Sequence, residues 1–352
     1  MKIGVLTLDG IANYGNRLQN YAVEEILKSM GCEVDTIIPR EMSIRSYSYT
    51  IRTILEKPIR SLKFILFNFF HINCRSVLSN KGRISPKLAE KYDYFIVGSD
   101  QVWNPNIKKK QREIYFLRFA NPEQRISLSA SLSVDKISDE YKDMYANYIS
   151  DFKNVSVREF KGAEIIKELC NKDVEVLCDP TIALEKEKWE KLIKNVFLKL
   201  PKKYLLTYFL GEYSKDRKND IENYAKIHNM EILSLNNKCY KKIYNAGPKE
   251  FVSLIKHAEL ICTDSFHGVA FSSIFNKPYW AFSRESKQEI VKNMESRIIS
   301  LQEKLCTEGR LVDRIYPQME YKMDYSIPNR RIKDEQKKFK KYLSNALNCQ
   351  EI

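Results

Sequence analysis

The sequence lacks paired cysteines, long apolar runs and a secretion signal. Its eight cysteines are scattered and no two stand at C-x-x-C spacing, which argues against a zinc site and against a disulfide-stabilised scaffold. No apolar run approaches the ~20 residues needed to span a bilayer. No signal peptide precedes the apolar run at residues 3–8, which has the composition of a core strand. We therefore expect a cytoplasmic protein.

Acidic residues are outnumbered, since 59 Lys and Arg against 45 Asp and Glu leave a net charge of +14. The surplus gathers in residues 40–92 (eleven basic, three acidic) and 329–352 (seven basic, three acidic). Such charge attracts nucleic acid, an anionic membrane face or an anionic substrate. We expect no nucleic-acid partner, because no recognised binding module accompanies the charge. For residues 59–72, which mix basic and aromatic side chains, we favour a buried helix with basic ends over peripheral contact with the inner face of a membrane.

The 352 residues suggest two domains, since one hydrophobic core seldom grows beyond ~250–300 residues. Short, continuously apolar runs recur in both halves and predict strands of parallel sheets that are covered by helices. They are residues 2–8, 34–38, 94–97, 125–128, 155–157, 174–177, 204–210, 231–235, 260–262 and 279–282. We predict an α/β fold with an N-terminal lobe (1–185) that carries a basic helical insertion at about 40–92, and a C-terminal lobe (186–320).

A basic helical tail is expected over residues 321–352. One face of this helix would carry Ile332, Phe339, Leu343 and Leu347, which recur at helical spacing.

Ligands of parallel α/β sheets bind beyond the carboxyl ends of the strands, so the polar residues that follow the predicted strands are the candidate site. The densest group is Thr263-Asp-Ser-Phe-His-Gly268, between a strand and a helix. A helix N-terminus is a natural anion site, and His267 is the candidate catalytic residue there. The alternative is a histidine whose ring bonds a neighbouring carbonyl in a tight turn.

Three other strand ends carry candidates. Arg158 could hold a phosphate or carboxylate with both prongs of its guanidinium, or else form an ion pair with Glu159 or another strand-end acid. Asp100 is either a general base or a turn cap. Asp179 precedes Pro180 where the chain passes between the lobes, and the loop into the first helix offers weaker candidates. No cluster of metal ligands is visible.

Taken in order, these segments resemble the polysaccharide pyruvyl transferase family. The likeness runs from residue 1 to about 315, and its most specific stretches are 97–105 and 263–278. The matching residues are Asn13-Tyr-Gly-Asn-Arg-Leu-Gln-Asn-Tyr-Ala22, Tyr92-Asp-Tyr-Phe-Ile-Val-Gly-Ser-Asp-Gln-Val-Trp-Asn-Pro105, Ser156-Val-Arg-Glu159, Cys178-Asp-Pro-Thr181, Gly247-Pro-Lys-Glu-Phe251, Thr263-Asp-Ser-Phe-His-Gly268 and, more weakly, Ser296-Arg297-Ile298.

The resemblance implies a fold similar to glycosyltransferase type B, with two Rossmann-like lobes facing a cleft. It also implies transfer of pyruvate from phosphoenolpyruvate, without a cofactor, to two hydroxyls of a sugar as a cyclic ketal. The acceptor would be a surface or capsular polysaccharide or its precursor, a lipid-linked oligosaccharide being one form. The chain departs from the family at Ser129-Ala-Ser-Leu-Ser133, where Ser-Ala-Ser-Phe-Gly is common.

Residue by residue, His267 matches the family's histidine beside phosphoenolpyruvate and Arg158 matches the arginine placed to hold its anionic groups. Ser265, Phe266 and Gly268 would line the donor pocket, and Asp100 falls on a nearby acidic position. Further residues expected at the site or its substrates are Asn13, Tyr14, Gly15, Gln19, Gln101, Asp179, Asp264 and Arg297.

Two other functions remain open from the sequence. One is a nucleotide-sugar glycosyltransferase of the same architecture. The other is a non-catalytic carbohydrate-binding relative that keeps the fold.

Overall fold

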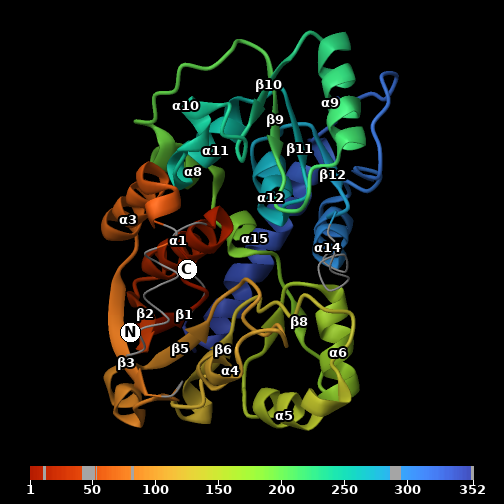
Figure 1. Ribbon diagram of the computed structural model, residues 1–352. Coiled ribbons are helices and arrows are strands. Elements are labelled where there is room, and N and C mark those ends of the chain that lie inside the picture. Colours follow the sequence, from red (N-terminus) through yellow and green to blue (C-terminus); the bar gives the residue numbers. More distant parts are fainter. Residues whose placement is uncertain (11–12, 42–51, 53, 81–82, 286–294, 350–352) are drawn as a thin grey trace. The chain divides into compact units, whose positions relative to one another are not determined.

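The computed structural model divides the chain into two compact units, Met1–Leu184 with Glu335–Ile352, and Glu185–Asp334 (Figure 1). It describes residues 1–10, 13–41, 52, 54–80, 83–285 and 295–349. Part of the predicted insertion at 40–92 therefore lies outside the described residues. Both units are α/β with parallel sheets, which confirms the predicted fold class.

The first unit is built on a six-stranded sheet in the order β4-β3-β2-β1-β5-β6, in which only the β3–β4 pair is antiparallel. A short parallel pair, β7-β8, adjoins it through the bridges Asp100–Ala130 and Ala130–Val157. The strands are β1 (Lys2–Leu6), β2 (Glu33–Glu41), β3 (Cys74–Asn80), β4 (Arg83–Ile84), β5 (Tyr94–Val97), β6 (Arg125–Ser127), β7 (Ser156–Val157) and β8 (Glu175–Val176).

Helices cover this sheet and complete its core. They are α1 (Tyr14–Ser29), α3 (Pro58–His71), η1 (Pro86–Lys91), α4 (Lys109–Tyr115), η2 (Pro122–Gln124), α5 (Asp139–Ser150), α6 (Phe160–Cys170) and α7 (Pro180–Ala183). Trp103, from the most specific family-like stretch, is fully buried, and its ring stacks on that of Phe116 with centroids 5.3 Å apart. The stretch after β5 therefore contributes to the hydrophobic core as well as to the polar residues that follow the strand.

The insertion contains more than the predicted helix. Strand β3 pairs in parallel with β2 and extends the sheet. Helix α3 is not the buried helix that we favoured, because only one of its faces is buried and several of its large apolar side chains are exposed. Hydrophobic periodicity could not identify the buried face, since the sequence of this helix is apolar almost all around.

The second unit has a five-stranded, all-parallel sheet in the order β10-β9-β11-β12-β13. Its strands are β9 (Tyr204–Tyr208), β10 (Glu231–Ser234), β11 (Leu260–Thr263), β12 (Tyr279–Phe282) and β13 (Leu311–Val312). Its helices are α8 (Lys186–Ile193), α9 (Lys215–Ile227), α10 (Lys241–Tyr244), α11 (Pro248–His257), α12 (Phe266–Ile274) and α14 (Ser296–Leu305). Pro248 occupies the first turn of α11, where its missing N–H costs nothing.

Helix α15 (Ser326–Ala346) forms most of the predicted tail, and from Glu335 onward it belongs to the first unit. Its predicted apolar face is confirmed, since Ile332, Phe339, Leu343 and Leu347 are all buried. The Tyr342 hydroxyl donates to the Ser127 carbonyl over 2.8 Å, at the end of β6. In the part of the chain that the structure describes, no helix is both long and apolar enough to cross a membrane.

Candidate active site

In the first unit, Asp179 is the centre of a buried polar network at the carboxyl ends of the strands. Its Oδ1 caps α7 by accepting the Thr181 N–H (2.9 Å) and hydroxyl (2.7 Å). Its Oδ2 accepts from the Ser99 hydroxyl (2.7 Å) and from Nη1 of Arg158 (2.9 Å). Asp179 thus joins the loop after β5, the end of β7 and the start of α7 into one rigid arrangement.

Arg158 lies in this network with only 2 % of its surface exposed. Besides Asp179, it contacts Glu159 Oε1 through Nη2 at 3.5 Å. Burial acts to lower the pKa of Arg158, but the carboxylates of Glu159, Asp179 and Asp100 outweigh it and raise that pKa. The ion pair that the sequence offered as an alternative is therefore present, and the guanidinium keeps its charge.

Asp100 has an unusual backbone for a residue with a side chain, with φ of 82° three residues after the end of β5. Such conformations are costly except for glycine and, to a lesser degree, Asn and Asp, and they gather at functional sites. Its Oδ1 accepts the N–H of Gln101 (2.9 Å). Its Oδ2 is buried and has no hydrogen-bond partner among the described residues. A buried acceptor in that state is expected to meet a donor from water or from a ligand.

Glu159 is a charged member of this network that we did not place at the site from the sequence, except as a partner of Arg158. Its Oε1 accepts from the Ser131 hydroxyl, which also shares a 2.6 Å hydrogen bond with Ser133. Its Oε2, like the Oδ2 of Asp100, is buried without a partner in the described part of the chain. Ser131 and Ser133 belong to the stretch that departs from the family pattern, so that departure lies within the network.

The residues predicted in the loop into α1 have structural contacts. Asn13 caps α1 by accepting the Asn16 N–H (3.3 Å). Tyr14 and Gly15 are buried, and the Tyr14 ring packs on Phe64 of α3. Gln19 is buried and donates to the Thr7 hydroxyl over 2.6 Å.

In the second unit, His267 lies in the first turn of α12, directly after β11, and is 8 % exposed. Ser265 caps this helix, its Oγ accepting the Gly268 N–H at 3.4 Å. Backbone N–H groups in the first turn of a helix lack intrahelical partners and carry the positive end of its dipole. The imidazole and the helix terminus therefore offer hydrogen bonding and positive potential in one place.

Asp264 holds the neighbouring loop. Its two carboxylate oxygens accept the N–H groups of Leu210 and Gly211, both at 2.7 Å, at the end of β9. The Arg284 guanidinium lies 3.4 Å from the same carboxylate. Asp264 is 3 % exposed, and its described contacts position the backbone around His267.

Helix α12 is fixed from two sides. Phe271 on this helix contacts Trp189 of α8 and Phe251 of α11, with ring centroids 4.8 and 5.9 Å apart. The family-like Gly-Pro-x-x-Phe stretch thus supports the helix that presents His267. On the strand side, a Cβ at Gly268 would lie 2.6 Å from Thr263 Oγ1, so only glycine allows this helix to approach β11 so closely.

The remaining predicted residues are Gln101, half-buried beside Asp100, and Arg297, buried in the first turn of α14. Phe266 is buried next to His267, with the two rings 5.2 Å apart and nearly perpendicular. Each unit thus carries its own set of predicted residues.

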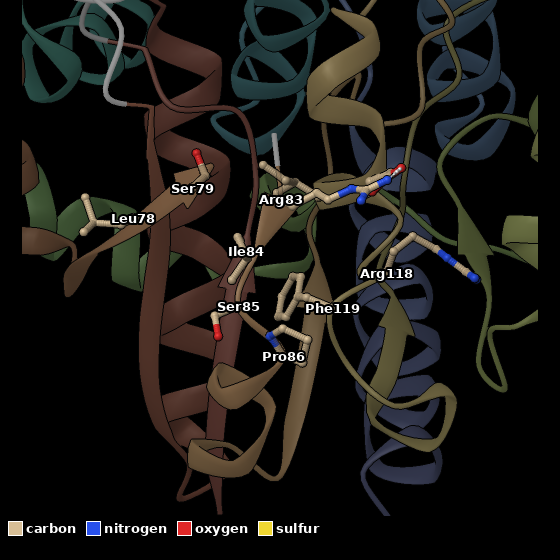
Figure 2. Close-up of a pocket in the computed structure, with 10 residues that line it drawn as sticks. Leu78, Ser79, Arg83, Ile84, Ser85, Pro86, Arg118 and Phe119 are labelled. Atoms are coloured by element: carbon tan, nitrogen blue, oxygen red, sulfur yellow. Dashed lines mark hydrogen bonds and ion pairs between the residues drawn. The ribbon is translucent and has the colours of Figure 1, made fainter. Parts of the chain in front are cut away.

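A cavity of about 750 Å³ lies elsewhere in the first unit, beside β4 and α4, and none of the predicted site residues lines it. Figure 2 shows Ile84, Pro86 and Phe119 gathered there, with Arg83 and Arg118 extending to one side. Both arginines have ion-pair partners, Glu113 and Asp151 respectively. Among the described residues, no group of three or more His, Cys, Asp or Glu side chains is arranged to hold a metal ion.

Comparison with solved structures finds chains of similar fold. UDP-GlcNAc 2-epimerase from Methanocaldococcus jannaschii aligns with a TM-score of 0.51 at 12 % identity, over 98 % of this chain and 100 % of that one. UDP-GlcNAc 2-epimerase from Neisseria meningitidis aligns with a TM-score of 0.49 at 13 % identity, over 100 % and 95 % of the two chains. At such identities the likeness concerns the fold alone.

Sequence comparison identifies the family. No curated protein matches the chain. The family model described as polysaccharide pyruvyl transferase matches residues 13–286, and this range includes every stretch on which the resemblance rests except the weak one at 296–298. The chain therefore belongs to the polysaccharide pyruvyl transferase family.

Proposed function

We propose that this chain transfers the pyruvyl group of phosphoenolpyruvate to two hydroxyls of one sugar, with His267 as the acid that starts the reaction. The acceptor is a sugar of a surface or capsular polysaccharide or of its precursor. The observation that supports this most is the position of His267, which lies in the family-matched range at the start of α12, directly after β11. The backbone around Ser265, Phe266 and Gly268 would receive part of the donor's negative charge.

The proposed chemistry balances without a cofactor. The His267 imidazolium gives a proton to the methylene carbon of phosphoenolpyruvate, which leaves a cationic centre at C2. A first sugar hydroxyl adds there and loses its proton to a base. The second hydroxyl then forms its own bond to C2 as the bond to phosphate breaks, and inorganic phosphate leaves with the remaining proton. The products are a pyruvate ketal, whose methyl group carries the proton from His267, and phosphate.

Charge explains why donor binding and protonation would be linked. An imidazolium at a helix N-terminus is disfavoured by the helix dipole. A bound phosphate and carboxylate would offset this cost, so the charged form of His267 is favoured while the donor is in place. The same pairing of opposite charges stabilises the cationic centre as it develops.

Arg158 and Asp100 are the proposed partners from the first unit. Arg158 supplies a permanent positive charge for the donor. To bind the donor, its guanidinium would give up a contact with Asp179 or Glu159 and contact an anionic group of the donor instead. Asp100 is the proposed base, since its buried Oδ2 has no hydrogen-bond partner in the described part of the chain and could accept from a sugar hydroxyl.

The test is phosphate release from phosphoenolpyruvate with a panel of galactose-, mannose- and glucosamine-type acceptors. We expect His267→Asn to lower kcat by about 10²–10⁴-fold, the usual contribution of a positioned acid. His257→Asn is the matched control, because His257 is exposed in the last turn of α11 and bonds the Ser253 carbonyl of its own helix (2.8 Å). Wild-type turnover by the His267 variant would remove the assignment, and a wild-type chain that releases no phosphate with any acceptor would count against the function itself.

A further inference from the structure

Helix α3 has two apolar faces on opposite sides, and one is used by the core of the first unit. Phe64 and Phe67 are buried, at 0 % and 3 % exposure. Phe64 packs on the ring of Tyr14 at 5.3 Å and Phe67 on that of Tyr21 at 6.0 Å, both on α1. These contacts fix how α3 is rotated about its axis, and so determine which residues face away from the core.

The opposite face, which we call the outer face of α3, consists of large apolar side chains that are all at least two-fifths exposed. Phe69 and Phe70 are the most exposed, at 79 % and 70 %, and the others are Ile59, Leu62, Ile65 and Leu66. Their spacing of three and four residues places them on one stripe. Single exposed apolar residues are common on soluble proteins, but a continuous apolar stripe marks an interaction surface.

The charge close to the outer face is mainly basic. Residues 57–72 contain no Asp or Glu. Of their basic residues, Arg60 is buried over the Tyr14 ring and His71 packs on Phe67, so both belong to the core face. Lys57 and Lys63 are half-buried. Lys63 stands four residues after Ile59 and seven before Phe70, at the border of the stripe. Arg52, before the helix, is 80 % exposed at its side chain and forms an ion pair with Glu56 at 2.8 Å. The outer face is therefore apolar with a basic margin.

This combination favours one kind of partner. A second copy packed across α3 would bring Lys57 and Lys63 of both chains together, and like charges repel. An anionic lipid surface supplies the opposite charge to the basic margin and a hydrocarbon boundary for the phenylalanines. At 14 residues, α3 is about 21 Å long, which is shorter than the ~30 Å core of a bilayer. It would lie in the plane of the interface.

We propose that the outer face of α3 docks the protein onto membranes that contain anionic lipid. Phe69 and Phe70 enter the boundary between headgroups and acyl chains, and Lys57 and Lys63 lie against the headgroups. This inference rests on α3 alone and does not depend on the proposed pyruvyl transfer, because binding to vesicles is measured without donor or acceptor.

The experiment is co-sedimentation of the full chain with vesicles of phosphatidylcholine alone or of phosphatidylcholine with phosphatidylglycerol in equal parts. We expect binding to the anionic vesicles that weakens as salt is added, because surface charge is screened. The double variant Phe69→Ser/Phe70→Ser should bind at least about tenfold more weakly, since it removes two large apolar side chains from the interface. Phe197→Ser is the matched control, because Phe197 is 89 % exposed and belongs to the second unit, whereas α3 belongs to the first.

Each other outcome overturns the proposal. Wild-type protein that stays in the supernatant with anionic vesicles excludes membrane docking, and equal loss in the Phe197 variant excludes a specific role for α3. Sedimentation velocity tests the alternative partner, which is a second copy of the chain. A wild-type dimer that becomes a monomer in the double variant, without vesicle binding, would assign the outer face to self-association instead. Unchanged thermal unfolding of the variants shows that these readouts do not arise from misfolding.

Discussion

At the scale of single residues, Asp100 combines backbone strain with an open acceptor. We expect Asp100→Asn to keep the fold, because Asn also tolerates positive φ, and to lower kcat by about 10²–10⁴-fold because the amide cannot take a proton. Asp100→Ala would in addition lower the free energy of unfolding by about 1–3 kcal/mol through backbone strain. Steady-state kinetics and thermal unfolding separate the two effects. Wild-type kcat in the Asn variant would leave Asp100 only the role of a turn cap.

The sequence predicted which residues follow the strands, but not how they are connected. Arg158 reaches Ser99 across 59 residues and Asp179 across 21, and such partners depend on the order of strands in the sheet. Glu159 could be read as the neighbour of Arg158, yet its hydrogen bond with Ser131 needs β6 and β7 side by side. Asp264 looked like a substrate residue, but its described contacts hold the loop after β9.

At the scale of elements, the contact between α12 and β11 should be sensitive to a single methyl group. In Gly268→Ala the new Cβ would meet Thr263 Oγ1 at 2.6 Å and Cγ2 at 2.9 Å. We expect a loss of about 1–3 kcal/mol in the free energy of unfolding from overpacking, together with reduced turnover as the turn that holds His267 shifts.

Chemical unfolding and phosphate release measure the two effects of this substitution. Gly10→Ala is the control, because its Cβ would have no described neighbour nearer than 3.7 Å. A Gly268 variant as stable and as active as the wild type would show that α12 can move away from β11 without disturbing His267.

Helices and strands could be predicted from the sequence where burial leaves one clear hydrophobic pattern. The strands flanking the candidate site, such as β5 and β12, match the continuous apolar runs because both of their faces are covered. Strand β3 was missed because its sequence, Cys-Arg-Ser-Val-Leu-Ser-Asn, is mostly polar and half-exposed at the side of the sheet. For α3, apolar residues on both faces predicted burial of the whole helix, whereas only the face on α1 is buried.

At the scale of the whole molecule, the net charge of +14 has more than one use. Arg158 adds nothing to this surplus, because carboxylates around it balance its charge inside the fold. Part of the surplus forms the basic margin of α3. Composition alone could not divide the charge between an anionic substrate and an anionic surface, because that division depends on which side chains the fold buries.

Ligand-dependent stability of the intact chain distinguishes the donor classes. A ligand at 100 times its Kd stabilises the folded state by about 2.7 kcal/mol, so phosphoenolpyruvate should raise the midpoint of thermal unfolding and UDP-sugars should not. Arg158→Lys should shrink the shift with phosphoenolpyruvate, because lysine cannot reproduce the two-pronged contact. Arg83→Lys, at the exposed ion pair beside the cavity of Figure 2, should leave it unchanged. Stabilisation by UDP-sugars alone would favour the nucleotide-sugar glycosyltransferase, whereas equal shifts in both variants would remove Arg158 from the donor site while leaving the test of His267 intact.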